Sequence, residues 1–190
     1  MRIVGGRHRG RHLIAPPGRA VRPTSDRARE ALFNILSHGA VAADGLPFAD
    51  AAVLDAFAGT GAFGLEALSR GAAEAVFIEN DRTALVALRG NIAALGLTAN
   101  TRIVAGDATK PPRATVACAV AFLDPPYTSG LAPPALIALA AAGWLAPDAL
   151  AVVEIGAREP FSPPEAFAAL DERVYGATRL VLLRREGREG

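Results

Sequence analysis

Short apolar runs alternate with stretches of helical periodicity through most of the chain. The spacing predicts helices over residues 63–70, 82–95 and 134–143. Runs that predict strands lie around these helices, at 52–57, 75–79, 102–105, 116–123 and 150–155. Because the runs are almost continuously apolar, both faces of the sheet they form must be covered. The pattern therefore predicts a doubly wound α/β fold, with a mostly parallel sheet between two layers of helices.

The pattern changes at both ends of the chain. Near the C-terminus, residues 173–175 and 178–184 flank Gly176-Ala177, a two-residue hairpin signal. We therefore expect the sheet to end in an antiparallel hairpin. Near the N-terminus, short extended segments at 2–4 and 12–15 are separated by glycine-rich turns, which predicts a basic hairpin or arm.

A helix is predicted after this arm. Thr24 or Ser25 supplies its N-cap, and Gly39 ends it. Helical spacing places five apolar residues on one face: Ala28, Ala31, Leu32, Ile35 and Leu36. The opposite, polar face is predicted to carry Arg27, Arg29 and Glu30.

Composition limits the class of protein. The chain has 190 residues, 51% of them hydrophobic and 21% charged, which suits one folded domain and excludes a disordered chain. The single cysteine, Cys118, excludes an intramolecular disulfide and a multi-cysteine zinc site, and no metal is expected. Without an apolar leader or a long apolar run, a cytoplasmic protein outside the membrane is expected. We expect one domain over 1–190, in which residues 1–40 form a basic arm and helix packed on a core of 48–190.

The net charge of +1 conceals an asymmetry. Residues 1–30 contain eight arginines against Asp26 and Glu30, a net charge of +6, and the rest of the chain carries −5. A basic arm on an acidic body favours an anionic partner such as nucleic acid. A solvated charged tail is the alternative.

A glycine-rich segment follows the first predicted strand. Residues 55–64 read Asp-Ala-Phe-Ala-Gly-Thr-Gly-Ala-Phe-Gly, with glycines spaced G-x-G-x-x-G. Glycine lets a ligand approach the backbone closely, and open α/β sheets bind ligands at the carboxyl ends of their strands. The spacing alone also occurs in ordinary tight turns. Its place after a strand predicts a cofactor loop.

Acidic residues end the next two predicted strands. Glu79 can accept hydrogen bonds from both hydroxyls of a ribose, an arrangement that NAD enzymes and S-adenosylmethionine enzymes share. Asn80 or Asp81 is expected to cap the helix that follows. Asp107 can accept from an adenine amino group, which a dinucleotide site does not usually need. Asp107 therefore favours S-adenosylmethionine.

The fourth predicted strand ends in Asp124-Pro125-Pro126-Tyr127. Two consecutive prolines fix the backbone and remove two N–H donors. A carboxylate, carbonyl oxygens and an aromatic ring remain, which form an acceptor-only pocket with a stacking wall. Such a pocket suits the exocyclic amino group of a planar base. A Pro-Pro loop with a surface tyrosine is the simpler alternative.

In this order, residues 55–64, Glu79, Asp107 and 124–127 resemble a class I S-adenosylmethionine-dependent methyltransferase that modifies amino groups. Two further segments, Arg-Pro-Thr-Ser-Asp-Arg-Ala-Arg-Glu-Ala-Leu-Phe-Asn-Ile-Leu at 22–36 and Gly-Ala-Phe-Gly-Leu-Glu-Ala-Leu-Ser-Arg-Gly at 61–71, narrow the match. They resemble the bacterial 16S rRNA guanine-N2 methyltransferases, the RsmD-like family, over essentially the whole chain. The resemblance implies a seven-stranded sheet and methylation of one guanine N2 in small-subunit rRNA.

The resemblance also implies the roles of individual residues. The catalytic set is Asp124, Pro125, Pro126 and Tyr127. The S-adenosylmethionine set is Asp55, Ala56, Phe57, Gly59, Thr60, Gly61, Glu79, Asn80, Asp107, Ala108 and Asp124. The RNA set is Arg7, Arg9, Arg11, Arg22, Thr24 and Arg27. The implied partner is 16S rRNA, within a small ribosomal subunit or its assembly intermediate, and a monomer is expected.

Two other functions stay open on the sequence. The Asp-Pro-Pro-Tyr motif also suits adenine N6 or cytosine N4, so the substrate could be DNA or another RNA. A non-enzymatic nucleic-acid-binding module is the third possibility, and it would leave Glu79, Asp107 and Asp124 without a role.

Overall fold

The computed structural model describes residues 1–15, 26–38, 41 and 47–187. Its strands are β1 (Ala52–Ala56), β2 (Glu74–Glu79), β3 (Thr101–Ala105), β4 (Cys118–Leu123), β5 (Leu145–Gly156), β6 (Phe167–Tyr175) and β7 (Thr178–Arg185). Its helices are α1 (Asp26–His38), α2 (Ala62–Ser69), α3 (Arg82–Leu95) and α4 (Ala132–Ala141), with short 3-10 turns η1 (Gly6–His8) and η3 (Thr98–Asn100).

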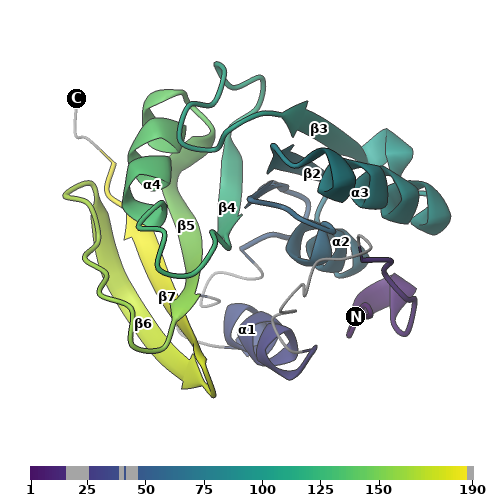
Figure 1. Cartoon of the computed structure of the whole chain (residues 1–190), viewed down its shortest axis with the longest axis horizontal. Helices are drawn as coiled ribbons and strands as arrows, with labels where there is room; N and C mark the ends of the chain where they lie inside the picture. Colours follow the sequence, from purple (N-terminus) through teal and green to yellow (C-terminus); the bar gives the residue numbers. More distant parts are fainter. Residues whose placement is uncertain (16–25, 39–40, 42–46, 188–190) are drawn as a thin grey trace.

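The strands form one sheet in the order β3-β2-β1-β4-β5-β7-β6 (Figure 1). β1 to β5 pair in parallel, and β7 is antiparallel to both of its neighbours, β5 and β6. The predicted parallel sheet with a C-terminal antiparallel hairpin is therefore confirmed. In such a sheet the carboxyl ends of β1 to β5 lie along one edge, which brings together the loops that follow them.

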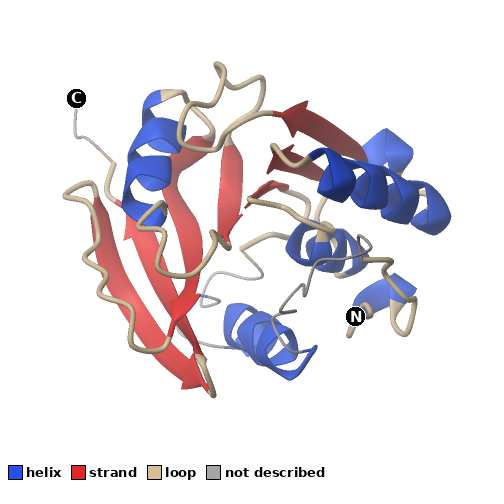
Figure 2. Ribbon diagram, viewed as in Figure 1, coloured by secondary structure: helices blue, strands red, loops and turns tan. Residues whose placement is uncertain are grey.

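Helices cover both faces of the sheet (Figure 2). On one face, buried residues of α1, α2 and α3 pack against Phe77 and Phe122, and on the other α4 packs with Trp144 against Leu54 and Val153. Cys118 is completely buried in β4, within the apolar run that predicted this strand. Burial raises the pKa of its thiol to about 12.

The helix signals at α3 are confirmed. Asp81 is the N-cap, and its carboxylate accepts from the backbone N–H groups of Thr83 and Ala84 at 2.9 and 2.8 Å. Gly96 ends the helix with φ of +70°, a conformation that a glycine adopts without strain. Asp81 and Gly96 thus set the start and the end of α3, the helix that connects β2 to β3.

Two strands, β5 and β6, extend beyond their predicted ranges by more than one residue. β5 begins at Leu145, five residues early, because it continues through Pro147 and Asp148, which favour turns. The pairing with β4 shifts register there, and Asp148 takes a φ of +58°. β6 is also longer than the predicted 173–175, because it is an edge strand that pairs only with β7, and its exposed residues mix Glu172 and Arg173 with Leu170 and Val174.

The predicted N-terminal hairpin is present and is docked on the body of the protein. Arg2 and His12 form an antiparallel bridge. The backbone N–H of Val4 donates to Glu66 of α2 at 2.8 Å, and a Cβ on Gly6 would lie 1.9 Å from the Ser69 carbonyl oxygen. The hairpin backbone is therefore a packed part of the fold, while its arginine side chains at 7, 9 and 11 stay exposed.

The predicted position of Arg29 on the polar face of its helix is wrong. Arg29 is completely buried, and its guanidinium pairs with Glu66 at 3.7 Å and with Asp26 at 2.9 Å. Arg70 pairs with the same Glu66 carboxylate at 2.7 Å. Arg29 shares a helix face with Leu32, Phe33 and Leu36, so this buried charge network joins α1 to α2.

Some of the expectations concern residues outside the described ranges. These are the contacts of Arg22, the N-cap at Thr24 or Ser25, the helix stop at Gly39 and the RNA contact of Thr24. In the ranges that are described, no helix combines the length and the apolar character needed to cross a membrane.

Candidate active site

The glycine-rich segment forms the turn between β1 and α2. The Asp55 carboxylate lies beneath it, 1% exposed, and accepts the Gly64 N–H at 2.9 Å. Burial raises the pKa of Asp55 to about 8, against the opposing effect of that hydrogen bond. Asp55 therefore stabilises the conformation of the glycine-rich loop, and it would contribute to cofactor binding only through the shape of that loop.

The three glycines serve different purposes. Gly59 has φ of +55°, and the nearest atom to a Cβ there would be the Phe57 carbonyl oxygen at 4.0 Å. A Cβ on Gly61 would lie 2.4 Å from Leu88, and one on Gly64 would lie 2.5 Å from Phe77. Only Gly59 therefore leaves open space for a ligand, whereas Gly61 and Gly64 allow α2 to pack closely against the sheet and α3.

We expect Gly64→Ala to lower the free energy of unfolding by about 1–3 kcal/mol, because the new methyl group overpacks the core against the Phe77 ring. Gly90→Ala, in the exposed part of α3, is the matched control. A Cβ there has nothing within 4 Å, so the substitution should stabilise by about 0.5–1 kcal/mol through helix propensity. Denaturant unfolding measures both. Equal stabilities for the two variants would refute the packing argument.

Glu79 connects three loops at the carboxyl edge of the sheet. Its carboxylate accepts from the backbone N–H of Gly59 at 2.7 Å and from those of Asn80 and Asp81 at 2.8 Å. Its backbone oxygen accepts from Gly106 at 2.9 Å. A carboxylate offers about four acceptor positions, so these bonds are compatible with a further one from a ribose hydroxyl.

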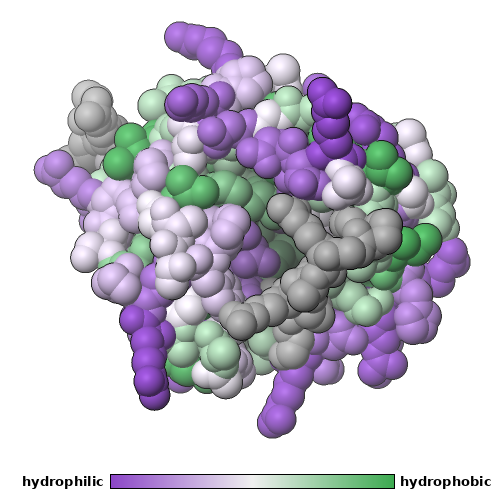
Figure 3. All heavy atoms as spheres, viewed as in Figure 1, coloured by the Kyte–Doolittle hydropathy of each residue, from purple (hydrophilic) through white to green (hydrophobic). Residues whose placement is uncertain are grey.

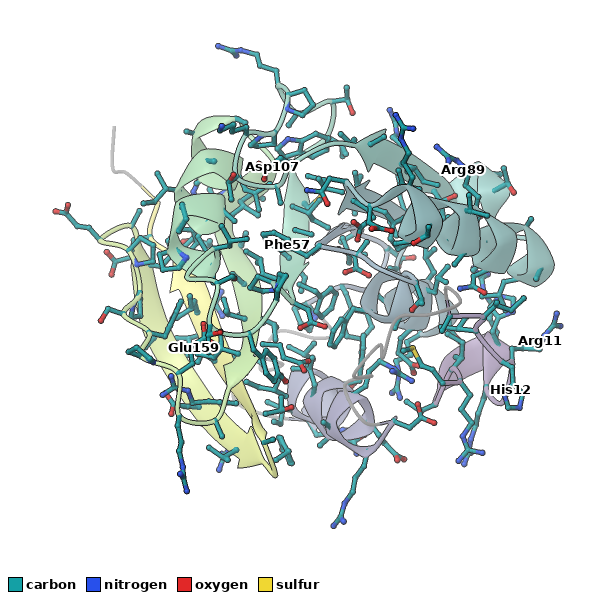
Figure 4. All side chains as sticks on the ribbon, in the orientation of Figure 1. Arg11, His12, Phe57, Arg89, Asp107 and Glu159 are labelled. Atoms are coloured by element: carbon teal, nitrogen blue, oxygen red, sulfur yellow. The ribbon has the colours of Figure 1, made fainter. Side chains whose placement is uncertain are left out.

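Asp107 stands in the loop after β3, and Figure 4 shows it above Phe57 in the view. Its carboxylate accepts from the backbone N–H and the hydroxyl of Thr109, both at 2.8 Å. These bonds hold the pKa of Asp107 below its ordinary value, so the group is ionised at neutral pH and suits an amino donor. Ala108, the next residue in the chain, is buried.

A row of three carboxylates crosses the carboxyl ends of β1, β4 and β5. Asp55 of β1 and Glu154 of β5 are 1% and 2% exposed, and Asp124 follows β4, the strand between them. Burial, then the charges of Glu154 and Asp55, raise the pKa of Asp124 well above its ordinary value. Mutual repulsion therefore disfavours ionising all three carboxyls together, and a positively charged group bound beside them would favour their ionised forms.

The Asp-Pro-Pro-Tyr loop is held in place by residues from β5 and β7. The Tyr127 hydroxyl donates to Glu154 at 3.0 Å and lies 2.8 Å from the Thr178 hydroxyl. Thr128, with φ of +60°, donates its backbone N–H to Glu159 at 2.8 Å. Pro125 is buried and Pro126 exposed. The ring of Tyr127 is therefore fixed at both ends, by the rigid prolines and by its hydroxyl.

Sequence reasoning missed four residues that shape the site: Glu66, Asn91, Glu154 and Glu159. A signal existed for Glu154, because it is the one charged residue in the apolar run 150–155. Glu159 gave no such signal, since it lies in a polar loop and its role depends on the distance to Thr128. It also accepts from the Gly156 N–H at 3.2 Å.

The sequence-predicted RNA residues lie apart from this row. Arg7, Arg9 and Arg11 are exposed on the hairpin, and Arg27 is exposed on α1. Figure 4 shows Arg11 and His12 at the edge of the molecule, while Phe57 lies near its centre. The Arg11 guanidinium also donates to the Ala94 carbonyl of α3 at 2.8 Å, which fixes one arginine of the set to the body.

These residues fit S-adenosylmethionine. Gly59 leaves open space above the loop, Glu79 and Asp107 stand at neighbouring strand ends, and the carboxylate row complements a sulfonium charge. In Figure 3 this face is hollowed near its centre, and hydrophilic side chains project around its rim. Sheet order and site together define a class I S-adenosylmethionine-dependent methyltransferase.

Comparison with known proteins identifies the family. Residues 1–184 match the family model described as Conserved hypothetical protein 95. The chain is 39% identical over 188 residues to ribosomal RNA small subunit methyltransferase D of Escherichia coli, covering 98% of this chain and 90% of the relative. The chain belongs to the family of ribosomal RNA small subunit methyltransferase D.

Two further matches agree with this assignment. The enzyme of the same name from Haemophilus influenzae is 36% identical over 181 residues, which cover 93% of this chain and 89% of the relative. The solved structure of yhhF from Escherichia coli superposes with a TM-score of 0.81 at 38% identity, covering 99% of each chain. The similarity therefore extends over the hairpin, the helices and the whole sheet.

Proposed function

We propose that this protein transfers a methyl group from S-adenosylmethionine to the N2 amino group of one guanine in 16S rRNA, within a small ribosomal subunit or its assembly intermediate. The observation that carries the proposal is the Asp-Pro-Pro-Tyr loop, because the Asp124 carboxyl interacts with Asp55 and Glu154 and the Tyr127 ring is anchored through its hydroxyl to Glu154. The rRNA named in the relatives supports the choice of substrate. All seven strands, β1 to β7, belong to one sheet, which supports the single domain expected over 1–190. We also propose that the protein acts in the cytoplasm as a monomer.

The cofactor-binding residues divide into those that touch the ligand and those that shape the loop. S-adenosylmethionine, when bound, supplies a methyl group that is already activated on its sulfonium. Glu79 would accept from a ribose hydroxyl, Asp107 from the adenine amino group, and Gly59 would let the ligand approach the backbone. Ala56, Phe57, Thr60, Gly61, Asn80 and Ala108 complete the lining in this proposal.

The amino group of guanine is a weak nucleophile, because its lone pair is delocalised into the ring. Asp124 and the Pro125 carbonyl would each accept one of its N–H groups and orient the lone pair. The amine gains positive charge during transfer, and the ionised Asp124 stabilises that charge. The raised pKa makes Asp124 a stronger base than an exposed aspartate, so it suits the proton that leaves nitrogen.

Tyr127 is proposed to stack on the extruded guanine. Its hydroxyl contacts with Glu154 and Thr178 add a feature that the sequence did not indicate, because they fix the plane of the ring. A ring that is already fixed loses little entropy when the base arrives. Stacking is worth about 1–3 kcal/mol per base and does not depend on the identity of the base.

One assay separates the candidate substrates. Tritiated methyl transfer is measured on 16S rRNA, on small subunits and on DNA, and the products are digested to nucleosides. We expect N2-methylguanosine in the rRNA or in the small subunits. Product containing N6-methyladenine or N4-methylcytosine would overturn the guanine assignment, and labelled DNA would overturn the RNA assignment.

Asp107→Ala should weaken binding of S-adenosylhomocysteine by about 1–3 kcal/mol, since one charged acceptor is removed. Glu79→Ala should weaken binding of S-adenosylhomocysteine more than Asp107→Ala does, because the Gly59 N–H also loses its hydrogen-bond acceptor. Calorimetry measures both affinities. Glu74→Ala, at the other end of β2, is the matched control and should bind like the parent. Parent-like affinity in both test variants would refute the cofactor assignment.

Arg7→Gln with Arg9→Gln should weaken RNA binding and reduce its salt dependence, by roughly one unit of slope for each phosphate that is no longer neutralised. Arg11 is left intact, since it also fixes the hairpin to α3. Affinities are measured for 16S rRNA over a series of salt concentrations. Arg173→Gln on the edge strand β6 is the control and should keep the parent slope. An unchanged slope in the hairpin variant would remove the arm from the RNA interface.

A further inference from the structure

One buried side chain connects the N-terminal hairpin to the glycine loop between β1 and α2. Asn91 of α3 is 1% exposed. Its amide oxygen accepts the Ile14 N–H at 2.8 Å, and its amide nitrogen donates to the Ile14 carbonyl at 3.1 Å and to the Thr60 carbonyl at 3.0 Å. The amide therefore bonds at once to the second strand of the hairpin and to the residue between Gly59 and Gly61.

A second contact joins the same two segments. The Thr60 hydroxyl donates to the Met1 sulfur at 3.5 Å, so both ends of the hairpin reach the glycine loop. Ser69, at the C-terminal end of the helix that begins at this loop, donates to the Gly5 carbonyl at 2.6 Å. The position of the hairpin and the shape of the loop are thus determined by shared hydrogen bonds.

We infer that Asn91 is a positioning residue that couples RNA binding by the hairpin to cofactor binding by the glycine loop. The inference rests on the proposed function and deepens it. Local opening breaks the Asn91 bonds and releases both segments. RNA needs the hairpin in place, and the cofactor needs the glycine loop in place. Whichever ligand binds first stabilises the state in which the Asn91 hydrogen bonds are formed, so the second ligand does not lose free energy in forming that state.

Thermodynamic linkage makes this coupling reciprocal. If RNA strengthens cofactor binding by a given factor, the cofactor strengthens RNA binding by the same factor. The arginine side chains of the hairpin do not take part in the Asn91 bonds, which involve the backbone of Ile14. Neutralising Arg7 and Arg9 should therefore reduce RNA affinity without changing the affinity for the cofactor alone.

The test measures the dissociation constant of S-adenosylhomocysteine, which cannot transfer a methyl group, with and without saturating 16S rRNA. For the parent we expect binding to be about fivefold or more tighter with RNA. Asn91→Asp keeps the size of the side chain and its acceptor for Ile14 but removes both donated bonds, so the ratio should fall towards one. Asn100→Asp is the matched control. Asn100 is an exposed asparagine that donates to the Ala73 carbonyl, and the parent ratio should persist in this variant.

A measurement on the unmodified protein makes the test independent of how well Asn91→Asp folds. S-adenosylhomocysteine alone should slow hydrogen exchange at the Ile14 amide, which lies in the hairpin. A parent ratio of one, an unchanged ratio in Asn91→Asp, or no slowing at Ile14 would each overturn the coupling. If the ligand fails to bind and no methyl is transferred, the proposed function itself fails. Binding and transfer with a ratio of one refute only the coupling.

Discussion

Asp124→Asn should lower the single-turnover rate of methyl transfer by about 100- to 1,000-fold, while S-adenosylhomocysteine binds almost as in the parent. Asparagine still accepts a hydrogen bond from the guanine amine, but it carries no charge to oppose the positive charge that develops on nitrogen. The variant also lacks a base for the departing proton. Rapid-quench assays with saturating rRNA separate this loss of rate from any loss of binding.

The pH dependence gives a second readout of the same residue. Burial and the charges of Glu154 and Asp55 raise the pKa of Asp124, and a base works only when it is ionised. The parent rate should therefore rise with pH over a range above that of an ordinary aspartate, and Asp124→Asn should lose this rise. Asp148→Asn, an exposed position with φ of +58°, is the matched control. A rate for Asp124→Asn close to that of the parent would remove the charge from the mechanism.

Glu66→Gln should lower the free energy of unfolding by about 3–5 kcal/mol, the cost of removing one partner of a buried ion pair, because Arg29 then keeps only the partly exposed Asp26 as its counter-charge. The side chains of Glu66 and Arg29 are both 0% exposed, so water cannot replace the missing charge. The amide keeps the size of the carboxylate but not its negative charge. Thermal and denaturant unfolding measure the effect, and limited proteolysis should show a loosened hairpin, since the Val4 N–H also bonds to Glu66.

The exposed pair between Glu74 and Arg102 provides the control. The side chain of Arg102 is 55% exposed and that of Glu74 is 25% exposed, so Glu74→Gln should cost only about 0–1 kcal/mol. The difference between the two variants isolates the effect of burial. Equal losses of stability would mean that the Glu66 network contributes no more than a surface ion pair.

The fold class and the main acidic residues of the site could be predicted because their signals are local. Continuous apolar runs identify strands covered on both faces, and the residue that ends each run must lie at the carboxyl edge of the sheet. Asp55, Glu79, Asp107 and Asp124 are therefore at the positions that the sequence indicated, although the structure makes Asp55 a support for the loop. The caps of α3 and the C-terminal hairpin depend on neighbouring residues in the same way.

Arg29 shows where such signals fail. A helical pattern indicates the buried face from apolar residues, so a charged residue is assigned to the outside by default. Arg29 lies on the same helix face as Leu32, Phe33 and Leu36. Its burial depends on the carboxylate of Glu66, which belongs to α2. The sequence contains both partners, but it does not show that they meet.

By itself, the sequence determined the sheet, the loops at its carboxyl edge and the kind of chemistry that those loops can perform. Only the tertiary structure decided which side chains connect them: Glu154 to Tyr127, Glu159 to Thr128, and Asn91 to both Ile14 and Thr60. These partners lie 27 to 77 residues apart in the chain, where no periodicity relates them. Their contacts depend on strand order and helix packing, because distances of about 3 Å arise only after distant elements have packed together.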